Sequence, residues 1–405
     1  MSERPAGNLL VLQGGGPTPV LNASLFGVIS EARQHPCFRR ILGARFGVAG
    51  LLKDDLVDLS SLPQREIERL KTTPGASLGS TRHKLSDADV EQIVGRLRER
   101  DVRSLLLIGG NGSMRGADLI AHGAAALGHE MIVIGIPKTI DNDISVTDRC
   151  PGFGSAARYV AQSVRDLAMD VQSLPQPVSI YETMGRSTGW LAGASALART
   201  REEDGPHLVY LPERAFDVEC FLGALDRVVT KLGWAVVVVT EGLLDATGKP
   251  IFESAVAAQR DALDRPLPGG VCVHLAEVVA RRLGIRCRWE KPGLCGRASS
   301  LHVSPVDRDD SQRVGRAGVR AALAGEHAQM VSLRPLEAPD DKACDLVPLS
   351  SVAGGDRRVP AEWLDDPDTA VTADFLRYVR PIVGSLVDYP VPLKDQLLPP
   401  PSLHG

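Results

Sequence analysis

Long apolar segments and paired cysteines are both missing from this sequence. No 18 apolar residues run together, and no apolar core of a secretory leader follows the first residues, so neither a membrane span nor a leader is expected. The seven cysteines are scattered and form no CxxC pair, which favours reduced thiols over a disulfide framework or a zinc site. We expect a soluble, cytoplasmic protein that does not bind membranes.

A strong excess of charge of one sign is missing as well. The chain has 46 lysines and arginines against 50 aspartates and glutamates, a net charge of -4, and therefore no overall attraction for nucleic acid. An anionic ligand would have to be held by a local cluster of basic residues. The length of 405 residues is enough for two or three domains with large cores.

What the sequence does contain is a repeated arrangement of a short apolar run, then glycines or charged residues, then in most cases a helix-like stretch. It occurs in five segments, 8–32, 102–127, 130–143, 177–198 and 234–244. Apolar strands alternating with helices predict an α/β fold with mainly parallel sheets covered by helices on both faces. Ligands bind such sheets beyond the carboxyl ends of the strands, where all five segments place their glycines and charges. One composite site is therefore expected there.

Two glycine-rich loops follow the first two of these strands, GGGPTP at 14–19 and GGNGS at 109–113. Glycine lets backbone N–H groups approach an anion closely, and the following helix N-terminus adds the positive end of its dipole. A tight turn without a ligand is an equally good interpretation of either loop alone, and neither matches the GxxxxGK[ST] pattern. A third stretch, GASLGSTRHKL at 75–85, adds Arg82, for which a solvated side chain is the simpler interpretation.

The segment PKTIDND at 137–143 is more specific, because it puts a lysine and two aspartates where a buried strand ends. Phosphoryl transfer to a hydroxyl needs a carboxylate base, which could be either Asp141 or Asp143. The other carboxylate could hold Mg²⁺ on the phosphates, and Lys138 could neutralise charge that develops on them. A solvated acidic loop would need neither the lysine nor the strand, so we favour the catalytic interpretation.

Arginines and a glutamate gather near the later strands. Arg186 lies between glycines at a strand–helix junction, and Glu241 ends a strand, where it could accept hydrogen bonds from sugar hydroxyls. Arg286, Arg288 and Arg297 follow with few acids, which suggests a sugar-phosphate clamp because guanidinium binds phosphate bidentately. A capped turn with a surface arginine and a solvated basic face are the competing interpretations.

Taken in order, GGGPTPVLN, GSTRHKL, GGNGSMRGA, PKTIDND, MGRSTGW and TEG resemble the phosphofructokinase family over about residues 8–300, and FLRYVRPIVG matches it more loosely. The resemblance implies a two-lobed α/β enzyme, each lobe a mainly parallel sheet with helices on both faces, that phosphorylates fructose 6-phosphate at its 1-hydroxyl with Mg²⁺. Residues 1–146, completed by part of 255–305, would bind the donor. Residues 147–405 would bind the sugar phosphate and carry a C-terminal extension.

The resemblance also implies roles for individual residues. Asp141 would be the general base, and Thr139 and Lys138 would contact the transition state. The sugar phosphate would contact Asp143, Met184, Gly185, Arg186, Glu241, Arg288 and Arg297. The donor phosphates would contact Gly16, Arg82, Gly110, Gly112 and Ser113. Family members are usually homo-oligomers, so a dimer or tetramer is expected, with an arginine borrowed from a neighbouring subunit.

Four positions bear on the metal and the donor. Asn111 stands where most of the family has the aspartate that serves Mg²⁺, which leaves a weaker, neutral ligand. Val20 and Lys138 are typical of members that use diphosphate, whereas Gly112 replaces an aspartate that typically excludes ATP. We favour diphosphate as the donor. The alternatives are ATP as donor, a longer acceptor such as sedoheptulose 7-phosphate, and a catalytically silent homologue that binds sugar phosphates.

Overall fold

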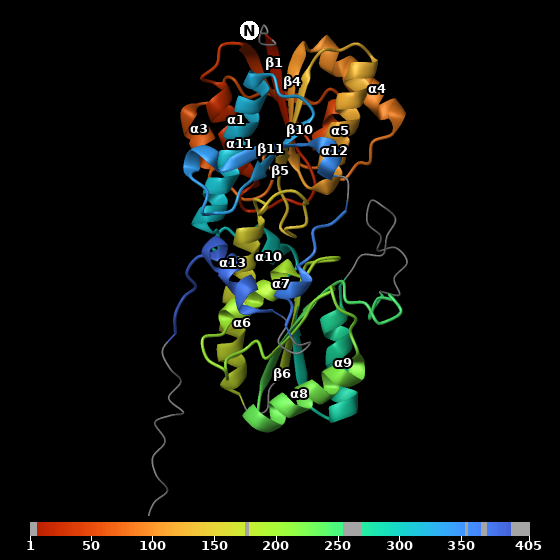
Figure 1. Cartoon of the computed structure of the whole chain (residues 1–405), viewed down its shortest axis with the longest axis vertical. Coiled ribbons are helices and arrows are strands. Elements are labelled where there is room, and N and C mark those ends of the chain that lie inside the picture. Colours follow the sequence, from red (N-terminus) through yellow and green to blue (C-terminus); the bar gives the residue numbers. More distant parts are fainter. Residues whose placement is uncertain (1–5, 175–177, 254–268, 353–354, 366–370, 390–405) are drawn as a thin grey trace, which may run out of the picture.

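A computed structural model describes residues 6–174, 178–253, 269–352, 355–365 and 371–389. Two sheets lie one above the other along the long axis of the molecule, each covered by helices (Figure 1). The α/β fold with mainly parallel sheets that the sequence predicts is confirmed.

The first sheet has seven strands in the order β11-β10-β5-β4-β1-β2-β3. The five central strands run parallel, and the two edge strands β3 and β11 are antiparallel to their neighbours. The strand bounds are β1 Gly7–Gln13, β2 Phe38–Ala44, β3 Leu56–Asp58, β4 Val102–Gly109, β5 Ile132–Pro137, β10 Gln329–Leu333 and β11 Cys344–Pro348.

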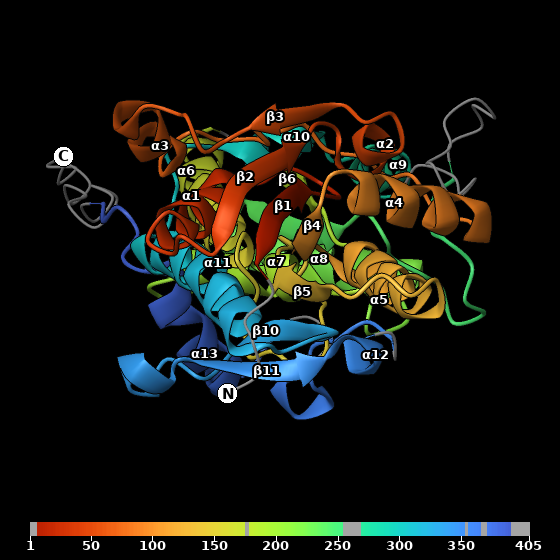
Figure 2. The ribbon, with the colours of Figure 1, turned by 90° about the horizontal axis from the view of Figure 1, so that it is seen from above.

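Helices cover both faces of the first sheet, as the view from above makes clear (Figure 2). One face carries α1 (Leu21–Ala32), α3 (Gln64–Leu70) and α11 (Pro305–Ala324), packed against the side chains of Leu9 and Val11. The other face carries α2 (Gly47–Leu52), α4 (Asp87–Glu99), α5 (Asn111–Ala126) and α12 (Leu349–Val352), packed against Leu10 and Leu12. Successive residues of β1 therefore pack into the cores on opposite faces of the sheet. Because β1 is buried on both faces, its side chains from Leu9 to Leu12 are all apolar.

The second sheet has four parallel strands in the order β7-β8-β6-β9. Its strands are β6 Val178–Thr183, β7 Leu208–Tyr210, β8 Ala235–Thr240 and β9 Cys287–Glu290. One face packs on α6 (Phe153–Gln172), α7 (Trp190–Ala194) and α13 (Ala373–Val383), and the other on α8 (Val218–Leu232) and α9 (Val271–Leu283). The short helix α10 (Leu294–Ala298) lies between the two sheets (Figure 1).

The five strands expected from the sequence are β1, β4, β5, β6 and β8, so all five predictions are confirmed. The chain is less simply divided than a boundary at residue 146 suggests, because β10 pairs with β5 and places residues 329–348 in the first sheet. Of the segment expected to complete that lobe, 255–268 lies outside the described residues. The division of donor and sugar binding between 1–146 and 147–405 stays a prediction.

Two further findings concern membrane-spanning helices and thiols. None of the helices that the structure describes is both long and apolar enough to span a bilayer. All seven cysteines lie in described parts of the chain, and all are free thiols.

Candidate active site

The first glycine loop, at the end of β1, is held in place by the segment that contains Arg82. Gly14 N–H donates to Ile108 O (2.8 Å), Gly15 N–H donates to Thr81 O (3.1 Å), and Ser80 Oγ donates to Gly15 O (2.6 Å). These bonds fix the chain immediately before the exposed Arg82 against residues 14–16.

Glycine is required in these loops partly because Ser113 packs into them. A Cβ on Gly14 would lie 2.5 Å from Ser113 Oγ, and a Cβ on Gly109 would lie 2.1 Å from the same atom. Gly112 differs, since no atom lies within 4 Å of the place where its Cβ would be. The first turn of α5 is therefore open around Gly112, which is exposed.

The loop after β5 that the sequence predicts to be catalytic, the catalytic loop, is held at its centre by Asn142. This residue is fully buried and has a left-handed backbone (φ 53°), a conformation that asparagine tolerates better than most residues. Its Nδ2 donates to Tyr378 Oη (3.1 Å), and its Oδ1 accepts from Cys150 N–H (3.0 Å). Asp141 and Asp143 flank this anchor, so their backbone is fixed on both sides.

Two cationic side chains, Lys138 and Arg297, meet at Gly16, and the charge of Arg82 acts on both. Lys138 is 3% exposed, and its Nζ donates to Gly16 O (2.8 Å). Burial lowers the pKa of Lys138 to about 8, although Asp141 opposes the shift. A Cβ on Gly16 would lie 3.0 Å from Arg297 Nη1, and the pKa of Arg297 is lowered by burial and by Arg82. Arg297 Nε is buried without a hydrogen-bond partner, so it could donate to a bound anion.

Carboxylates occupy the adjacent side of the site. Burial, then Asp143 and then Glu241 raise the pKa of Asp141 to about 7. The pKa of Asp143 is raised by burial and by Asp356, and that of Glu241 by burial and by Glu182. A carboxylate with a pKa near 7 is suited to accept a proton at neutral pH.

The loop after β6 reaches across from the second sheet to the catalytic loop. Thr188 Oγ1 donates to Asp141 O (3.1 Å), and Glu241 N–H donates to Thr183 O (3.1 Å). A Cβ on Gly242 would lie 1.9 Å from Arg186 O, so the ends of β6 and β8 approach each other as closely as glycine allows. The half-buried Met184 packs against the core, and Gly185 has a φ of 131°. The carboxyl ends of both sheets thus meet at Asp141.

Arg288 and Arg297, which the sequence predicts to bind the sugar phosphate together, lie apart from each other. Arg288 is on the edge strand β9 opposite Ser179, with its side chain 49% exposed and 3.9 Å from Asp170. Ser179 is four residues before the carboxyl end of β6, so a single chain does not bring Arg288 to the catalytic loop. Arg297 lies with the donor residues at Gly16 rather than beside Arg288.

Sequence reasoning missed Asp356, which lies at the mouth of the site. Asn111 Nδ2 donates to Asp143 Oδ2 (3.0 Å) and to Asp356 Oδ1 (3.3 Å). Ser187 Oγ donates to Asp356 Oδ2 (2.6 Å). Asp356 follows no predicted strand and has no motif around it, so only the fold reveals its position.

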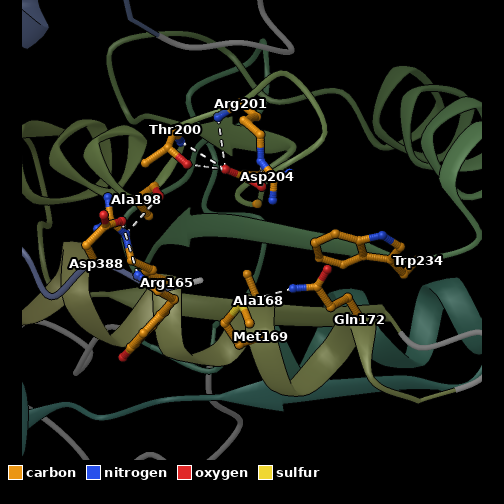
Figure 3. A pocket seen from close by; sticks show the side chains of 12 residues that line it. Arg165, Ala168, Met169, Gln172, Ala198, Thr200, Arg201, Asp204, Trp234 and Asp388 are labelled. Atoms are coloured by element: carbon orange, nitrogen blue, oxygen red, sulfur yellow. Dashed lines mark hydrogen bonds and ion pairs between the residues drawn. The ribbon is translucent and has the colours of Figure 1, made fainter. Parts of the chain in front are cut away.

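A small cavity in the second lobe is separate from this site (Figure 3). Its volume is about 40 Å³, and Arg165, Met169 and Gln172 of α6 form one wall. They lie three or more helical turns from Phe153, where α6 begins beside the catalytic loop. Arg165 donates to Leu197 O, Ala198 O and Val387 O, so its guanidinium is not available to an anion.

Comparison with known proteins places the chain in context. The sequence pattern of the phosphofructokinase family matches residues 8–322. The pyrophosphate–fructose 6-phosphate 1-phosphotransferase of Xanthomonas campestris pv. campestris (strain B100) is 40% identical over 386 residues, 93% of this chain and 91% of that protein. The sulfofructose kinase of Alkalicoccus urumqiensis is 36% identical over 358 residues, 87% of this chain and 91% of that protein. The crystal structure of the pyrophosphate-dependent enzyme from Nitrosospira multiformis superposes with a TM-score of 0.86 at 32% identity, covering 97% of this chain and 95% of that one.

Proposed function

The chain belongs to the phosphofructokinase family, and we propose that it transfers a phosphoryl group from inorganic diphosphate to the 1-hydroxyl of fructose 6-phosphate. The observation that carries this function is the position of Asp141, between three cationic side chains and the loop after β6. The product is fructose 1,6-bisphosphate, so the enzyme serves glycolysis. Its place in the cytoplasm is part of the proposal.

Asp141 acts as the general base. With a pKa of about 7, it is substantially ionised at neutral pH and still basic enough to take the proton of the 1-hydroxyl. Its backbone is held by Thr139 Oγ1, which accepts from Asp141 N–H (3.1 Å), and by Thr188. The oxygen freed of its proton then attacks the transferred phosphoryl group, and the second phosphate of the donor leaves.

The sugar phosphate is held by residues that surround this base. Met184, Gly185, Arg186 and Glu241 line the ends of β6 and β8, and Asp143 approaches from the catalytic loop. Glu241 accepts hydrogen bonds from sugar hydroxyls, and Arg186 binds an anionic group.

Diphosphate is held by Lys138, Arg82 and Arg297 at Gly16. Three cations in a partly buried site match the several negative charges of a compact diphosphate, and no nucleoside is needed to anchor it. The N-terminus of α5 provides the backbone N–H groups of Gly110 and Gly112 for the phosphates, whereas Ser113 N–H donates to Gly110 O (2.9 Å) and leaves its hydroxyl as the donor. Lys138 and Arg297 neutralise the negative charge that grows on the leaving phosphate.

Mg²⁺ fits the site, with Asn111 and Asp143 as its protein ligands. Asn111 Oδ1 and Asp143 Oδ1 are both buried and have no hydrogen-bond partner, so both are available to a cation. Among the residues that the structure describes, no three His, Cys, Asp or Glu side chains form a ready metal centre. This suits Mg²⁺, which is usually bound by one or two carboxylates together with substrate phosphates. When bound, it neutralises and orients the donor phosphates.

A homo-oligomer, a dimer or tetramer, completes the sugar-phosphate site with Arg288 of a neighbouring subunit. The support is that Arg288 lies on an exposed edge strand beside Trp289 (48% exposed) and close in sequence to Leu294 (63% exposed). Exposed apolar side chains of this size next to an unpaired strand edge are typical of an interface. Light scattering of the purified protein tests the assembly, and a monomer at micromolar concentration contradicts it.

ATP is the second candidate donor, because the space around Gly112 is open. Steady-state assays of the purified protein with Mg²⁺ separate the possibilities. Diphosphate and ATP are compared as donors, and fructose 6-phosphate, sedoheptulose 7-phosphate and sulfofructose as acceptors. We expect the highest kcat/KM with diphosphate and fructose 6-phosphate. Turnover with ATP but not diphosphate overturns the donor, and binding of fructose 6-phosphate without turnover points to a silent homologue.

A further inference from the structure

The segment 355–360, between α12 and the helices of the second lobe, is tied to both sides of the site by its backbone. Arg357 N–H donates to Asp143 O (2.8 Å) in the catalytic loop. Arg357 O accepts from Trp190 Nε1 (3.0 Å), and the Arg357 guanidinium lies 4.5 Å from the centroid of the Trp190 ring at the start of α7. This segment therefore holds Asp356 in a fixed place between the lobes.

The two carboxylate oxygens of Asp356 contact different loops. Oδ1 accepts from Asn111 Nδ2 (3.3 Å) in the loop proposed to bind the donor, and Oδ2 accepts from Ser187 Oγ (2.6 Å) in the loop proposed to bind the sugar. The side chain is exposed, where an aspartate is normally solvated and free to rotate. Here both oxygens are engaged, one by Asn111 and the other by Ser187.

We propose that Asp356 is a positioning residue that couples the donor loop to the sugar loop, so that each substrate binds more tightly when the other is present. The inference rests on the proposed function, because that function assigns a substrate to each loop. Both bonds are to a carboxylate and are therefore about twice as strong as bonds between neutral groups. The bond to Ser187 (2.6 Å) is shorter than the bond to Asn111 (3.3 Å), so it is the stronger of the two.

The physical basis is a shared ordering cost. A substrate that fixes one loop also fixes Asp356, and through it the hydrogen-bonding group on the other loop. The second substrate then meets a loop that is already ordered, and its binding loses less conformational entropy. By linkage the effect is reciprocal, and it applies to equilibrium binding.

Calorimetry measures this coupling directly, with methylenediphosphonate and Mg²⁺ in place of diphosphate so that no turnover occurs. The dissociation constant of methylenediphosphonate is determined with and without saturating fructose 6-phosphate. Wild type should bind it at least about 5-fold more tightly when the sugar phosphate is present, within the usual range of such couplings. In Asp356→Ala the ratio should fall to within about 2-fold of unity.

A double-mutant cycle identifies the path. Ser187→Ala should lower the coupling as Asp356→Ala does. The double variant should lose no more coupling than either single variant, because each of the three variants breaks the hydrogen bond between Ser187 and Asp356. Asp356→Asn keeps the shape of the side chain and serves if the alanine variant folds poorly. Asp345→Asn, an exposed aspartate of β11 paired with Arg334, is the matched control and should keep the wild-type coupling.

Hydrogen exchange provides a readout that needs no substrate. In Asp356→Ala the amides of 110–113 and of 185–189 should both exchange faster, whereas Asp345→Asn should leave them unchanged. Coupling and exchange that match wild type in Asp356→Ala, or a wild type without coupling, overturn the inference even if the enzyme is active. If wild type does not bind fructose 6-phosphate, the proposed function fails. Hydrogen exchange of the amides in the two loops then decides by itself whether Asp356 links them.

Discussion

Replacing Asp141 by asparagine separates the chemistry of the site from its architecture. The hydrogen bonds that hold this residue are made by its backbone, to Thr139 Oγ1 and from Thr188 Oγ1, so the side chain can be changed without breaking them. Asparagine has nearly the same shape but cannot accept the proton of a hydroxyl. We therefore expect turnover to fall while the affinity for fructose 6-phosphate stays close to that of wild type.

The loss of activity should appear in kcat. A positioned general base contributes about 10²–10⁴-fold, and that factor should be lost from both kcat and kcat/KM because the interaction exists only in the transition state. A variant that raises KM and leaves kcat unchanged would assign Asp141 to sugar binding.

The same substitution should stabilise the folded protein, by an amount that depends on pH. Burial and nearby carboxylates raise the pKa of Asp141 from 3.8 to about 7, so the folded state binds a proton more readily than the unfolded chain. Ionising Asp141 therefore costs stability progressively as pH rises from about 4 to about 7, and the cost is constant above that. Each pKa unit corresponds to 1.36 kcal/mol, so ionising Asp141 lowers the free energy of unfolding by at most about 4 kcal/mol at pH 8 and about 2 kcal/mol at pH 5.5. Asparagine removes this cost but is itself a buried amide, so we expect a net gain of about 1–3 kcal/mol at pH 8.

The assay is thermal unfolding of both proteins at pH 5.5 and pH 8, beside steady-state kinetics. With the entropy of unfolding scaled to the length of this chain, 1 kcal/mol corresponds to about 1 °C, so the variant should melt about 1–3 °C higher at pH 8 and by less at pH 5.5. A variant that melts lower at pH 8, or whose difference from wild type does not change with pH, refutes the electrostatic account. Near-normal kcat refutes the role as base.

Three other expectations follow from the same geometry. Asn111→Asp replaces an amide that donates to Asp143 and Asp356 by a further carboxylate. Mg²⁺ should therefore half-saturate the activity of this variant at a lower concentration, and it should raise the melting temperature of the variant more than that of wild type. An unchanged Mg²⁺ dependence would show that position 111 is not part of the metal site. Gly112→Asp should fold normally, because no atom lies within 4 Å of the new Cβ. The added carboxylate should repel the nucleotide phosphates and suppress any activity with ATP, while the activity with diphosphate stays unchanged. Activity with ATP that survives in this variant shows that ATP does not pass Gly112. The kcat/KM of wild type should rise with pH through about 7 as Asp141 ionises and fall through about 8 as Lys138 loses its proton; a profile flat from pH 6 to 9 contradicts both assignments.

The parts of this fold that the sequence predicts are those with local signals. An apolar run with glycine at its carboxyl end marks β1, β4, β5, β6 and β8, and the requirement that parallel strands end at one edge brings their loops together. The pairing of β10 with β5 has no such signal, because it depends on a contact between segments almost 200 residues apart. Its position on the first sheet follows from α11, which packs against α1 and returns the chain to that lobe.

The same distinction applies to the site residues. Lys138 and Asp141 are adjacent to a strand end, and their spacing alone predicts a catalytic role for them. The structure places both where the two sheets meet, and the role itself stays a prediction. Asp356 acts through a tertiary contact and cannot be found from spacing. Arg288 and Arg297 are close in sequence, yet β9 ends at Glu290 and the chain turns through α10, which takes Arg297 to Gly16.

Burial is the main cause of the shifted pKa values of Lys138 and Asp141, and neighbouring groups of like charge add to it. Burial and neighbouring arginines lower the pKa of Lys138, while burial and neighbouring carboxylates raise that of Asp141, and each opposes the shift of the other. A bound diphosphate adds negative charge beside the cations, which restores the pKa of Lys138 toward its ordinary value and keeps it protonated. A cation held by Asn111 and Asp143 would lower the pKa of Asp141 and favour its ionised form. Under the proposed function, donor and metal together therefore favour the charged forms of both Lys138 and Asp141, which are the forms that phosphoryl transfer requires.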